Sequence, residues 1–318
     1  MRVCVTRPIP EPGLSLLAEK GVEVLVREAD VPPDENELAS LAGEFPVLIT
    51  LLTDPVTEQV LSSGVRLVAQ FAAGYDNVDM AAATRHRVAI TNTPGVLTEA
   101  TAELTWALIL AVARQVVASD QYTRNGRFRA WGATLFLGTE LAGKTLGILG
   151  TGRIGTRVGE IAHAFGMKVI YFDLLPSESL DSLGGRRASL QEVLREADVV
   201  SVHLPLTHET RGLIGEEELR QMKPTAILVN TARGPILDER ALARALKEGR
   251  IAGAGLDVYE NEPIVNTELS GLDNVVLLPH IGSATHEARN AMSIAVAENI
   301  TAFVEGRRPP NILNPEVL

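Results

Sequence analysis

Three charged side chains that could carry acid–base chemistry follow three successive strand-like segments in the second half of the chain. Arg233 follows the apolar run AILVN, Glu262 follows GAGLD, and His280 follows VVLL. Because ligands of open α/β sheets bind outside the carboxyl ends of the strands, we predict that the three side chains meet at one sheet edge. Each has a structural alternative: Arg233 as a loop cap, Glu262 as a surface acid before proline, and His280 as a hydrogen-bonded strand-end residue. Glu260 also competes for the acidic position.

A guanidinium, an imidazole and a carboxylate at one site suit a substrate that carries a carboxylate beside a carbonyl. The guanidinium binds a carboxylate through two hydrogen bonds and polarises the neighbouring carbonyl. The imidazole gives or takes a hydroxyl proton near neutral pH. A carboxylate hydrogen-bonded to it orients the ring and stabilises its charged form. We therefore predict Arg233, Glu262 and His280 as catalytic residues, with the hydride supplied by a bound nucleotide.

A glycine-rich loop of the kind that binds dinucleotides begins at Gly150. The run Gly150-Thr151-Gly152-Arg153-Ile154-Gly155 has the spacing G-x-G-x-x-G, follows a strand-like segment and opens a helical pattern, which is the context that supports the motif. Gly150 permits a tight turn, Gly152 lets the backbone approach a pyrophosphate, and Gly155 lets helix and strand pack closely. The first N–H groups of the helix then bind the phosphate charge. The motif alone leaves flavin enzymes and methyltransferases open.

Asp173 ends the strand-like segment KVIYFD that follows the glycine loop. A carboxylate at this place accepts the ribose hydroxyls of the adenosine and repels a 2′-phosphate. No Arg or Lys follows until Arg186, whereas Glu178 and Asp181 come first. This favours NAD over NADP, although Asp173 could also be a turn residue.

Short β-branched segments alternate with helical ones along the chain, which predicts parallel α/β sheets. Strands are expected at 2–6, 22–26, 47–51, 67–71 and 88–92, with helices around 12–20 and 57–62. From residue 145 onward, strands are expected at 145–149, 168–172, 199–204, 226–230, 253–257 and 275–278, with helices at 154–165, 190–196, 216–222 and 239–248. Six successive strands make a complete dinucleotide-binding sheet.

The predicted fold class is α/β, with two Rossmann-like parallel-sheet domains. We expect a dinucleotide-binding domain over 100–285, inserted into a smaller flavodoxin-like substrate domain made of 1–99 and 286–318. The last helical pattern, 283–305, is available to return to the first domain. An apolar helix is expected over 98–117, buried between domains or subunits, followed by an irregular loop over 125–143.

Composition narrows the classes of function. The chain has 318 residues, 46% of them hydrophobic, and a formal net charge of −11. It shows no basic face for nucleic acid and no apolar run long enough to span a membrane. Cys4 is the only cysteine and is expected to be buried and inert; with no signal peptide visible, we expect a reducing cytoplasm. No metal is expected.

The chain resembles the D-isomer-specific 2-hydroxyacid dehydrogenases along essentially its whole length. The matching stretches are AAGYDNVD, NTPGVLTEATAELTWAL, GTGRIG, LPLTHETRGLI, NTARGPILDERALARALKEGRIAGAGLDVYENEP and DNVVLLPHIGSAT. Leu51-Leu52-Thr53, the segment WGATLFLG and the C-terminal RRPPNILNP resemble the glyoxylate and hydroxypyruvate reductase branch.

The resemblance implies a role for each matching residue. Arg233 would bind the substrate carboxylate and carbonyl, His280 would be the acid/base, and Glu262 would partner His280. The other implied contacts are the following: Asp257 near the nicotinamide amide; Thr231, Ala232 and Gly282 along the nicotinamide; Arg153 and Ile154 at the pyrophosphate; Pro205 at the adenosine; and Leu51, Ala73 and Gly74 at the substrate. Glyoxylate reductases often carry basic or hydroxyl residues where Asp173 stands, so this position departs from an NADP pattern.

The expected function is therefore transfer of a hydride between NAD(H) and a small 2-keto or D-2-hydroxy acid, in the cleft between the domains of a homodimer. Glyoxylate and hydroxypyruvate are the first candidate substrates. Two alternatives stay open on the same scaffold: a non-catalytic NADH-sensing protein and a dehydrogenase for another small anion such as phosphite.

Overall fold

The computed structural model describes all 318 residues, which form two compact units. Unit 1 consists of Met1–Leu97 and Ser283–Leu318, and unit 2 consists of Thr98–Gly282. Unit 2 is thus inserted into unit 1 in the sequence. The predicted fold class, two parallel-sheet α/β domains, is confirmed.

Unit 1 contains a five-stranded parallel sheet in the order β2-β1-β3-β4-β5, which is the flavodoxin-like order. The strands are β1 (Arg2–Val5), β2 (Glu23–Val26), β3 (Val47–Thr50), β4 (Leu67–Gln70) and β5 (Ala89–Thr91). The helices are α1 (Glu11–Glu19), α2 (Glu35–Glu44), α3 (Glu58–Leu61), α4 (Met80–Arg85) and α13 (His286–Val304). The sequence analysis missed α2 and α4, whose first turns are capped by Asp34 and Asp79.

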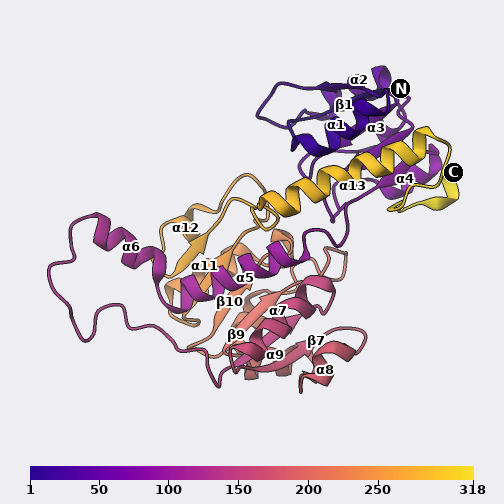
Figure 1. Cartoon of the computed structure of the whole chain (residues 1–318). Coiled ribbons are helices and arrows are strands. Elements are labelled where there is room, and N and C mark those ends of the chain that lie inside the picture. Colours follow the sequence, from indigo (N-terminus) through magenta and orange to yellow (C-terminus); the bar gives the residue numbers. More distant parts are fainter. The chain divides into compact units, whose positions relative to one another are not determined.

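The last helix, α13, lies along α1, so the C-terminal segment belongs to unit 1 (Figure 1). The two helices meet at Gly13, where an added Cβ would lie 2.0 Å from the carbonyl oxygen of Ser293. The Ser293 hydroxyl accepts a hydrogen bond from the Gly13 amide at 2.9 Å and donates to the Pro10 carbonyl. Only glycine permits this approach.

Unit 2 contains a seven-stranded parallel sheet in the order β12-β11-β10-β9-β6-β7-β8. The strands are β6 (Thr145–Leu149), β7 (Lys168–Phe172), β8 (Arg186–Arg187), β9 (Val199–Val202), β10 (Ile227–Asn230), β11 (Gly253–Leu256) and β12 (Val275–Leu277). The prediction of six strands was wrong by one, because β8 consists of two exposed arginines and carries no apolar pattern.

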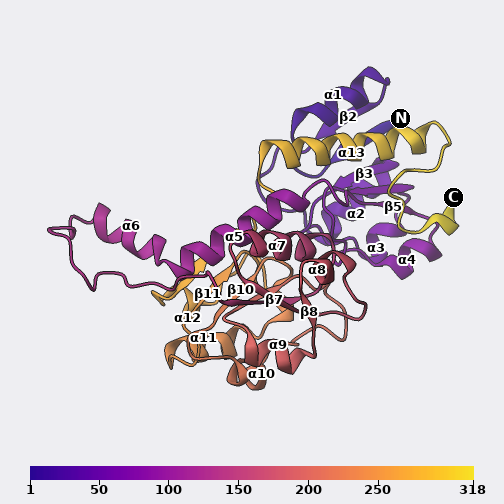
Figure 2. The same ribbon diagram turned by 60° about the horizontal axis from the view of Figure 1, so that its bottom comes forward.

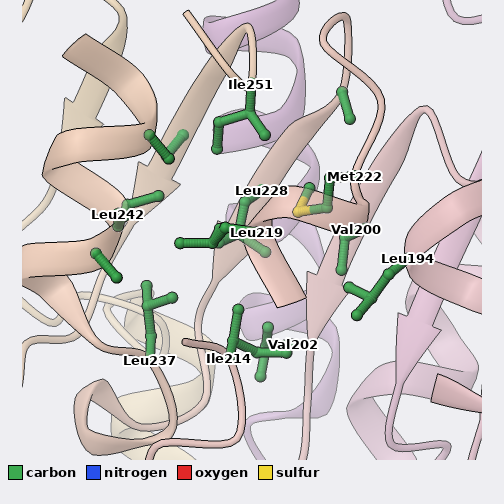
Figure 3. Packing of buried hydrophobic residues seen from close by; sticks show 14 of the residues in the cluster. Leu194, Val200, Val202, Ile214, Leu219, Met222, Leu228, Leu237, Leu242 and Ile251 are labelled. Carbon is green, nitrogen blue, oxygen red and sulfur yellow. The ribbon is translucent and has the colours of Figure 1, made fainter. Parts of the chain in front are cut away.

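Helices cover both faces of the unit 2 sheet (Figure 2). On one face, α5 (Thr98–Ala113) packs on β10, β11 and β12 and on α7 (Arg153–Ala164), beside α8 (Glu178–Ser182). The other face carries α9 (Leu190–Glu196), α10 (Glu216–Gln221) and α11 (Glu239–Lys247), with α12 (Thr267–Ser270) next to β12. Figure 3 shows aliphatic side chains such as Val200, Leu228 and Leu242 packed between the sheet and the helices of this second face. The buried residues of this layer are aliphatic apart from Tyr259.

The helix predicted over 98–117 ends earlier than expected. Gln115 adopts a left-handed backbone (φ +50°), and the chain bends by 64° between α5 and α6 (Val116–Arg124). Helix α6 and the loop after it, residues 114–143, extend away from the sheet in both views; we call this the projecting segment (Figures 1 and 2). No single helix is long and apolar enough to cross a membrane; only α5 and α6 taken together meet that test.

Candidate active site

The glycine loop joins β6 to α7 and leaves space in front of the helix. Gly150 has φ +96°, and a Cβ there would lie 2.8 Å from the backbone of His203. A Cβ on Gly155 would lie 2.0 Å from the Gly150 carbonyl oxygen, whereas one on Gly152 would meet no atom within 4 Å. The space beside Gly152, at the start of α7, is therefore open, and the helix start offers N–H groups to an anion, which fits the pyrophosphate of a dinucleotide. Arg153 and Ile154 are the first residues of this helix.

Asp173 follows β7 and is bound to the glycine loop. One carboxylate oxygen accepts hydrogen bonds from the Thr151 amide (2.6 Å) and hydroxyl (3.0 Å), and the other accepts from the Leu175 amide (3.3 Å). Burial acts to raise the pKa of Asp173, but these hydrogen bonds outweigh it and hold the pKa below its usual value. The carboxylate is thus charged and fixed beside the loop, which fits an adenosine ribose. Pro205 lies beyond the end of β9, two strands away.

A basic residue that the sequence analysis missed lies next to Asp173. Strand β8 pairs with β7 and aligns Arg187 with Tyr171. The Arg187 guanidinium donates to the carbonyl oxygens of Asp173 (Nε, 3.1 Å) and Leu174 (Nη2, 2.5 Å). Arg187 is distant from Asp173 in the sequence. The pairing of the edge strand β8 with β7 brings the two residues into contact.

His280 and Glu262 form a hydrogen-bonded pair at the carboxyl ends of β12 and β11. His280 Nδ1 lies 2.8 Å from Glu262 Oε2, and Glu262 Oε1 accepts the Tyr259 amide at 3.0 Å. The partner of His280 in this structure is therefore Glu262 and not Glu260, whose amide donates to the buried Glu239. His280 itself has φ +54°, an uncommon backbone for a non-glycine residue, of the kind found where surrounding structure holds a functional side chain.

Asp257 binds the backbone of the loop that carries His280. Its side chain is buried, with 1% of the residue exposed, and its Oδ1 accepts the Ile281 amide at 2.7 Å. A Cβ on Gly282 would lie 3.2 Å from Asp257 Oδ2, so Gly282 packs against the same carboxylate. Burial raises the pKa of Asp257, and the amide hydrogen bonds act against that rise. Asp257 was expected near a nicotinamide amide; the structure shows that it also fixes the backbone on which His280 is carried.

Arg233 follows β10, the neighbour of β11 in the sheet, so all three catalytic candidates lie at the carboxyl ends of adjacent parallel strands. Asn230 shapes this turn by donating to the Arg233 carbonyl and accepting the Ala232 amide, both at 3.0 Å. Arg233 Nη1 donates to the Ala232 carbonyl at 2.7 Å. The Thr231 hydroxyl pairs with that of Thr105 on α5 at 2.8 Å.

Tyr259 connects the three strand ends, and the sequence analysis missed it. A Cβ on Gly234, next to Arg233, would lie 1.9 Å from the Tyr259 carbonyl carbon, so the two turns are in tight contact. The Tyr259 amide binds Glu262, and its hydroxyl donates to the Leu278 carbonyl at 2.7 Å. Burial raises the pKa of Tyr259 to about 12, so the phenol stays a donor.

The three predicted substrate contacts of unit 1 lie just beyond its strands. Leu51 follows β3; its amide donates to the buried Asp54 at 2.7 Å, and its carbonyl accepts from Asn77 at 3.2 Å. Ala73 and Gly74 follow β4, and the Ala73 carbonyl accepts from Asn92 at 2.7 Å. Asp54 and Asn77, which hold the Leu51 turn, were not predicted: Asp54 lies outside the quoted motifs, and Asn77 lies within AAGYDNVD but had no role attached to it.

Comparison with known proteins assigns the chain to a family. Residues 106–282 match the family of the D-isomer specific 2-hydroxyacid dehydrogenase, NAD binding domain. The chain belongs to this family.

Relatives match the dehydrogenase over its full length. Glyoxylate reductase of Aeropyrum pernix is 52% identical, with 100% of this chain and 97% of the relative covered, and glyoxylate reductase of Thermococcus litoralis is 48% identical, with 100% and 98% covered. Among solved structures, TT0316 of Thermus thermophilus has a TM-score of 0.93 at 45% identity, with 98% and 100% covered.

A second solved structure shows a cofactor. It is an NADPH-dependent glyoxylate/hydroxypyruvate reductase of Sinorhizobium meliloti in complex with NADP and malonate, with a TM-score of 0.87 at 33% identity and 99% and 97% covered. By its family, whose matching domain is an NAD binding domain, the present chain is an oxidoreductase that uses a nicotinamide cofactor.

Tyr259→Phe tests whether the Tyr259 hydroxyl sets the geometry of this dehydrogenase. The variant removes the hydrogen bond to the Leu278 carbonyl. Loss of such a hydrogen bond costs about 1 kcal/mol, which corresponds to roughly a fivefold change in rate. We expect hydride transfer in a single turnover, followed by nicotinamide absorbance, to slow by about three- to tenfold with an unchanged amplitude.

The matched control is Tyr171→Phe, since the Tyr171 hydroxyl also makes buried hydrogen bonds, donating to Asp181 at 2.6 Å and accepting the Ser177 amide at 3.0 Å. Both variants should lose similar thermal stability, but only Tyr259→Phe should lower the rate constant. Equal rate constants in the two variants would show that Tyr259 serves folding alone.

Proposed function

We propose that this dehydrogenase is an NADH-dependent reductase of glyoxylate and hydroxypyruvate, which acts on the 2-keto/D-2-hydroxy acid couple. The observation that carries the proposal is the His280–Glu262 pair at the same sheet edge as Arg233, in the unit that also contains the glycine loop. The glyoxylate reductases named above support the choice of substrate.

We propose one catalytic role for each of the three side chains, supported by their placement at adjacent strand ends. Gly150–Gly155 and Asp173 would hold a nicotinamide cofactor, whose chemistry would be hydride donation to the carbonyl carbon. Arg233 binds the substrate carboxylate and polarises its carbonyl. Because His280 Nδ1 is engaged by Glu262, Nε2 is the nitrogen that gives its proton to the carbonyl oxygen in reduction and takes it back in oxidation. Glu262 fixes the ring and balances the positive charge of the protonated imidazole.

The remaining contacts are proposed from the resemblance and from the placement of each residue. Unit 2 is the dinucleotide-binding domain and unit 1 the substrate domain. Thr231, Ala232, Asp257 and Gly282 are assigned to the nicotinamide side, Arg153 and Ile154 to the pyrophosphate, Pro205 to the adenosine, and Leu51, Ala73 and Gly74 to the substrate. We also assign the enzyme to the cytoplasm, on the ground that its single cysteine, Cys4, is a buried thiol.

A substrate panel with both cofactors tests the proposed activity. We expect kcat/KM with glyoxylate and hydroxypyruvate to exceed that with pyruvate and 2-ketoglutarate. We expect NADH to be favoured over NADPH by about tenfold, because the charged Asp173 repels a 2′-phosphate. Turnover of none of these keto acids, with NADH binding intact, would instead support a nucleotide-sensing protein.

Alanine substitutions should distinguish the proposed role of His280 from that of Arg233. His280→Ala removes the general acid and should lower kcat by about 10²–10⁴-fold, with NADH affinity unchanged in a fluorescence titration. Arg233→Ala should lower kcat/KM by a similar order and also raise KM, since the guanidinium acts on the substrate carboxylate. His163→Ala, at an exposed histidine of α7, is the control. Wild-type turnover by His280→Ala would refute the mechanism.

We further propose that the enzyme is a homodimer whose subunits meet through the projecting segment. This segment exposes several large apolar side chains, Trp131 at 83% and Leu137 at 69% being the most exposed; the others are Val116, Val117, Phe128 and Leu135. The contact was expected around 98–117, but about half of α5 is buried inside unit 2. A protein in water rarely leaves so many neighbouring apolar side chains uncovered, so a second copy is the proposed cover.

The double variant Trp131→Glu/Leu137→Glu should therefore convert the dimer to a monomer, because two charges per subunit would have to be buried at the contact. Sedimentation velocity over a concentration series measures the mass. The control is Val31→Glu, which places a charge on an exposed apolar residue of unit 1. A wild-type protein that sediments as a monomer would remove the proposal.

A further inference from the structure

Strand β8 places a cation at the exit of β7, where the adenosine ribose of a bound dinucleotide is expected. β8 is the edge strand of the unit 2 sheet, and its two residues align with Ile170 and Tyr171 of β7. Arg187 therefore lies at the same carboxyl edge as Asp173, although the two are well separated in sequence. The residues around them, Leu174 and Leu175, are among the most exposed apolar residues of the chain.

The Arg187 guanidinium is bound to backbone carbonyls and not to a carboxylate. It donates to the carbonyl oxygens of Asp173 and Leu174 and takes part in no ion pair, and its side chain is exposed. The Asp173 carboxylate is directed elsewhere, toward the amide and hydroxyl of Thr151. The positive charge of Arg187 is therefore not neutralised by its neighbour and remains accessible to an anion.

We propose that Arg187 is a second determinant of cofactor choice: a latent binding residue for the 2′-phosphate of NADP, whose use Asp173 opposes. This inference rests on the proposed nicotinamide function and names the part of it that sets cofactor preference. Asp173 accepts ribose hydroxyls and repels a phosphate, whereas Arg187 attracts a phosphate at nearly the same place. The enzyme's preference for NADH is then the difference between the repulsion of a 2′-phosphate by Asp173 and its attraction by Arg187. Removal of the Asp173 carboxylate should leave the attraction by Arg187 unopposed.

The neighbouring arginine offers a matched control. Arg186 precedes Arg187 on the same strand and is similarly exposed, but its guanidinium is paired with Glu196 at 2.7 Å and lies 3.7 Å from Glu192. Adjacent residues of a strand point to opposite sides, and the charge of Arg186 is already balanced. A general effect of positive charge at this edge would involve both arginines, whereas a specific 2′-phosphate contact would involve Arg187 alone.

The experiment measures binding of two adenosine probes without any keto acid. Adenosine 2′,5′-bisphosphate represents the adenosine half of NADP, and adenosine 5′-diphosphate represents that of NAD. Isothermal titration would compare the wild type, Asp173→Ser, Arg187→Ala, the double variant Asp173→Ser/Arg187→Ala, and Asp173→Ser/Arg186→Ala. Steady-state kinetics with NADH and NADPH would follow on the same proteins.

We expect Asp173→Ser to bind the 2′,5′-bisphosphate at least about tenfold more tightly than the wild type, through charge-assisted hydrogen bonds to Arg187. Adding Arg187→Ala should remove most of that gain, whereas adding Arg186→Ala should leave it. Affinity for the 5′-diphosphate should change little on removal of either arginine.

Equal affinity of Asp173→Ser with and without Arg187 for the 2′,5′-bisphosphate would overturn the inference, and so would an equal loss on removal of Arg186. Neither result bears on the proposed activity, which fails separately if the wild type binds NADH but reduces no keto acid. A wild type that binds neither probe nor NADH would refute both.

Discussion

The hydrogen bond between His280 and Glu262 depends on a constraint that neither residue supplies: strands β11 and β12 must end side by side, with the chain beyond each of them held in one conformation. His280 has a left-handed backbone, which costs an L-residue free energy unless its surroundings impose it. Those surroundings are Asp257, which binds the Ile281 amide after the histidine, and Tyr259, which binds the Leu278 carbonyl before it. The proposed catalytic pair is thus positioned by backbone contacts on both sides of the histidine.

The same arrangement explains why Glu262, and not Glu260, is paired with His280. The Tyr259 amide orients the Glu262 carboxylate, while the Glu260 amide is bound by Glu239 from α11. Glu239 is buried, and burial raises its pKa above the usual value although the hydrogen bond from the Glu260 amide acts against that rise. The start of α11, which follows the Arg233 turn, therefore fixes the loop that carries the acidic partner. The turns that carry Arg233 and Glu262 are therefore in contact, through Gly234 against Tyr259 and through Glu239.

Much of this site could be predicted because its parts are local in sequence. A strand, a glycine loop, a helix and a terminal acid follow one another from 145 to 173, and strand ends can be located from apolar runs alone. The strand pattern alone left Glu260 as a competitor of Glu262, since both follow the same strand. The family resemblance favoured Glu262, and the hydrogen bonds of the folded chain distinguish the two. Tyr259, Asp54 and Asn77 were missed for a related reason: their function is to hold backbone that other residues use.

Strand β8 shows a different limit of sequence reasoning. Two exposed arginines carry neither the alternation nor the apolar run by which strands are recognised, and β8 is a strand only because β7 offers an unpaired edge. The pairing changes the chemistry of the edge, since it places Arg187 against the backbone of Asp173. Asp173 alone therefore does not determine the charge that a bound adenosine meets at the end of β7. In an α/β sheet the neighbouring strand ends at the same edge, so the charge it carries acts near the same ligand.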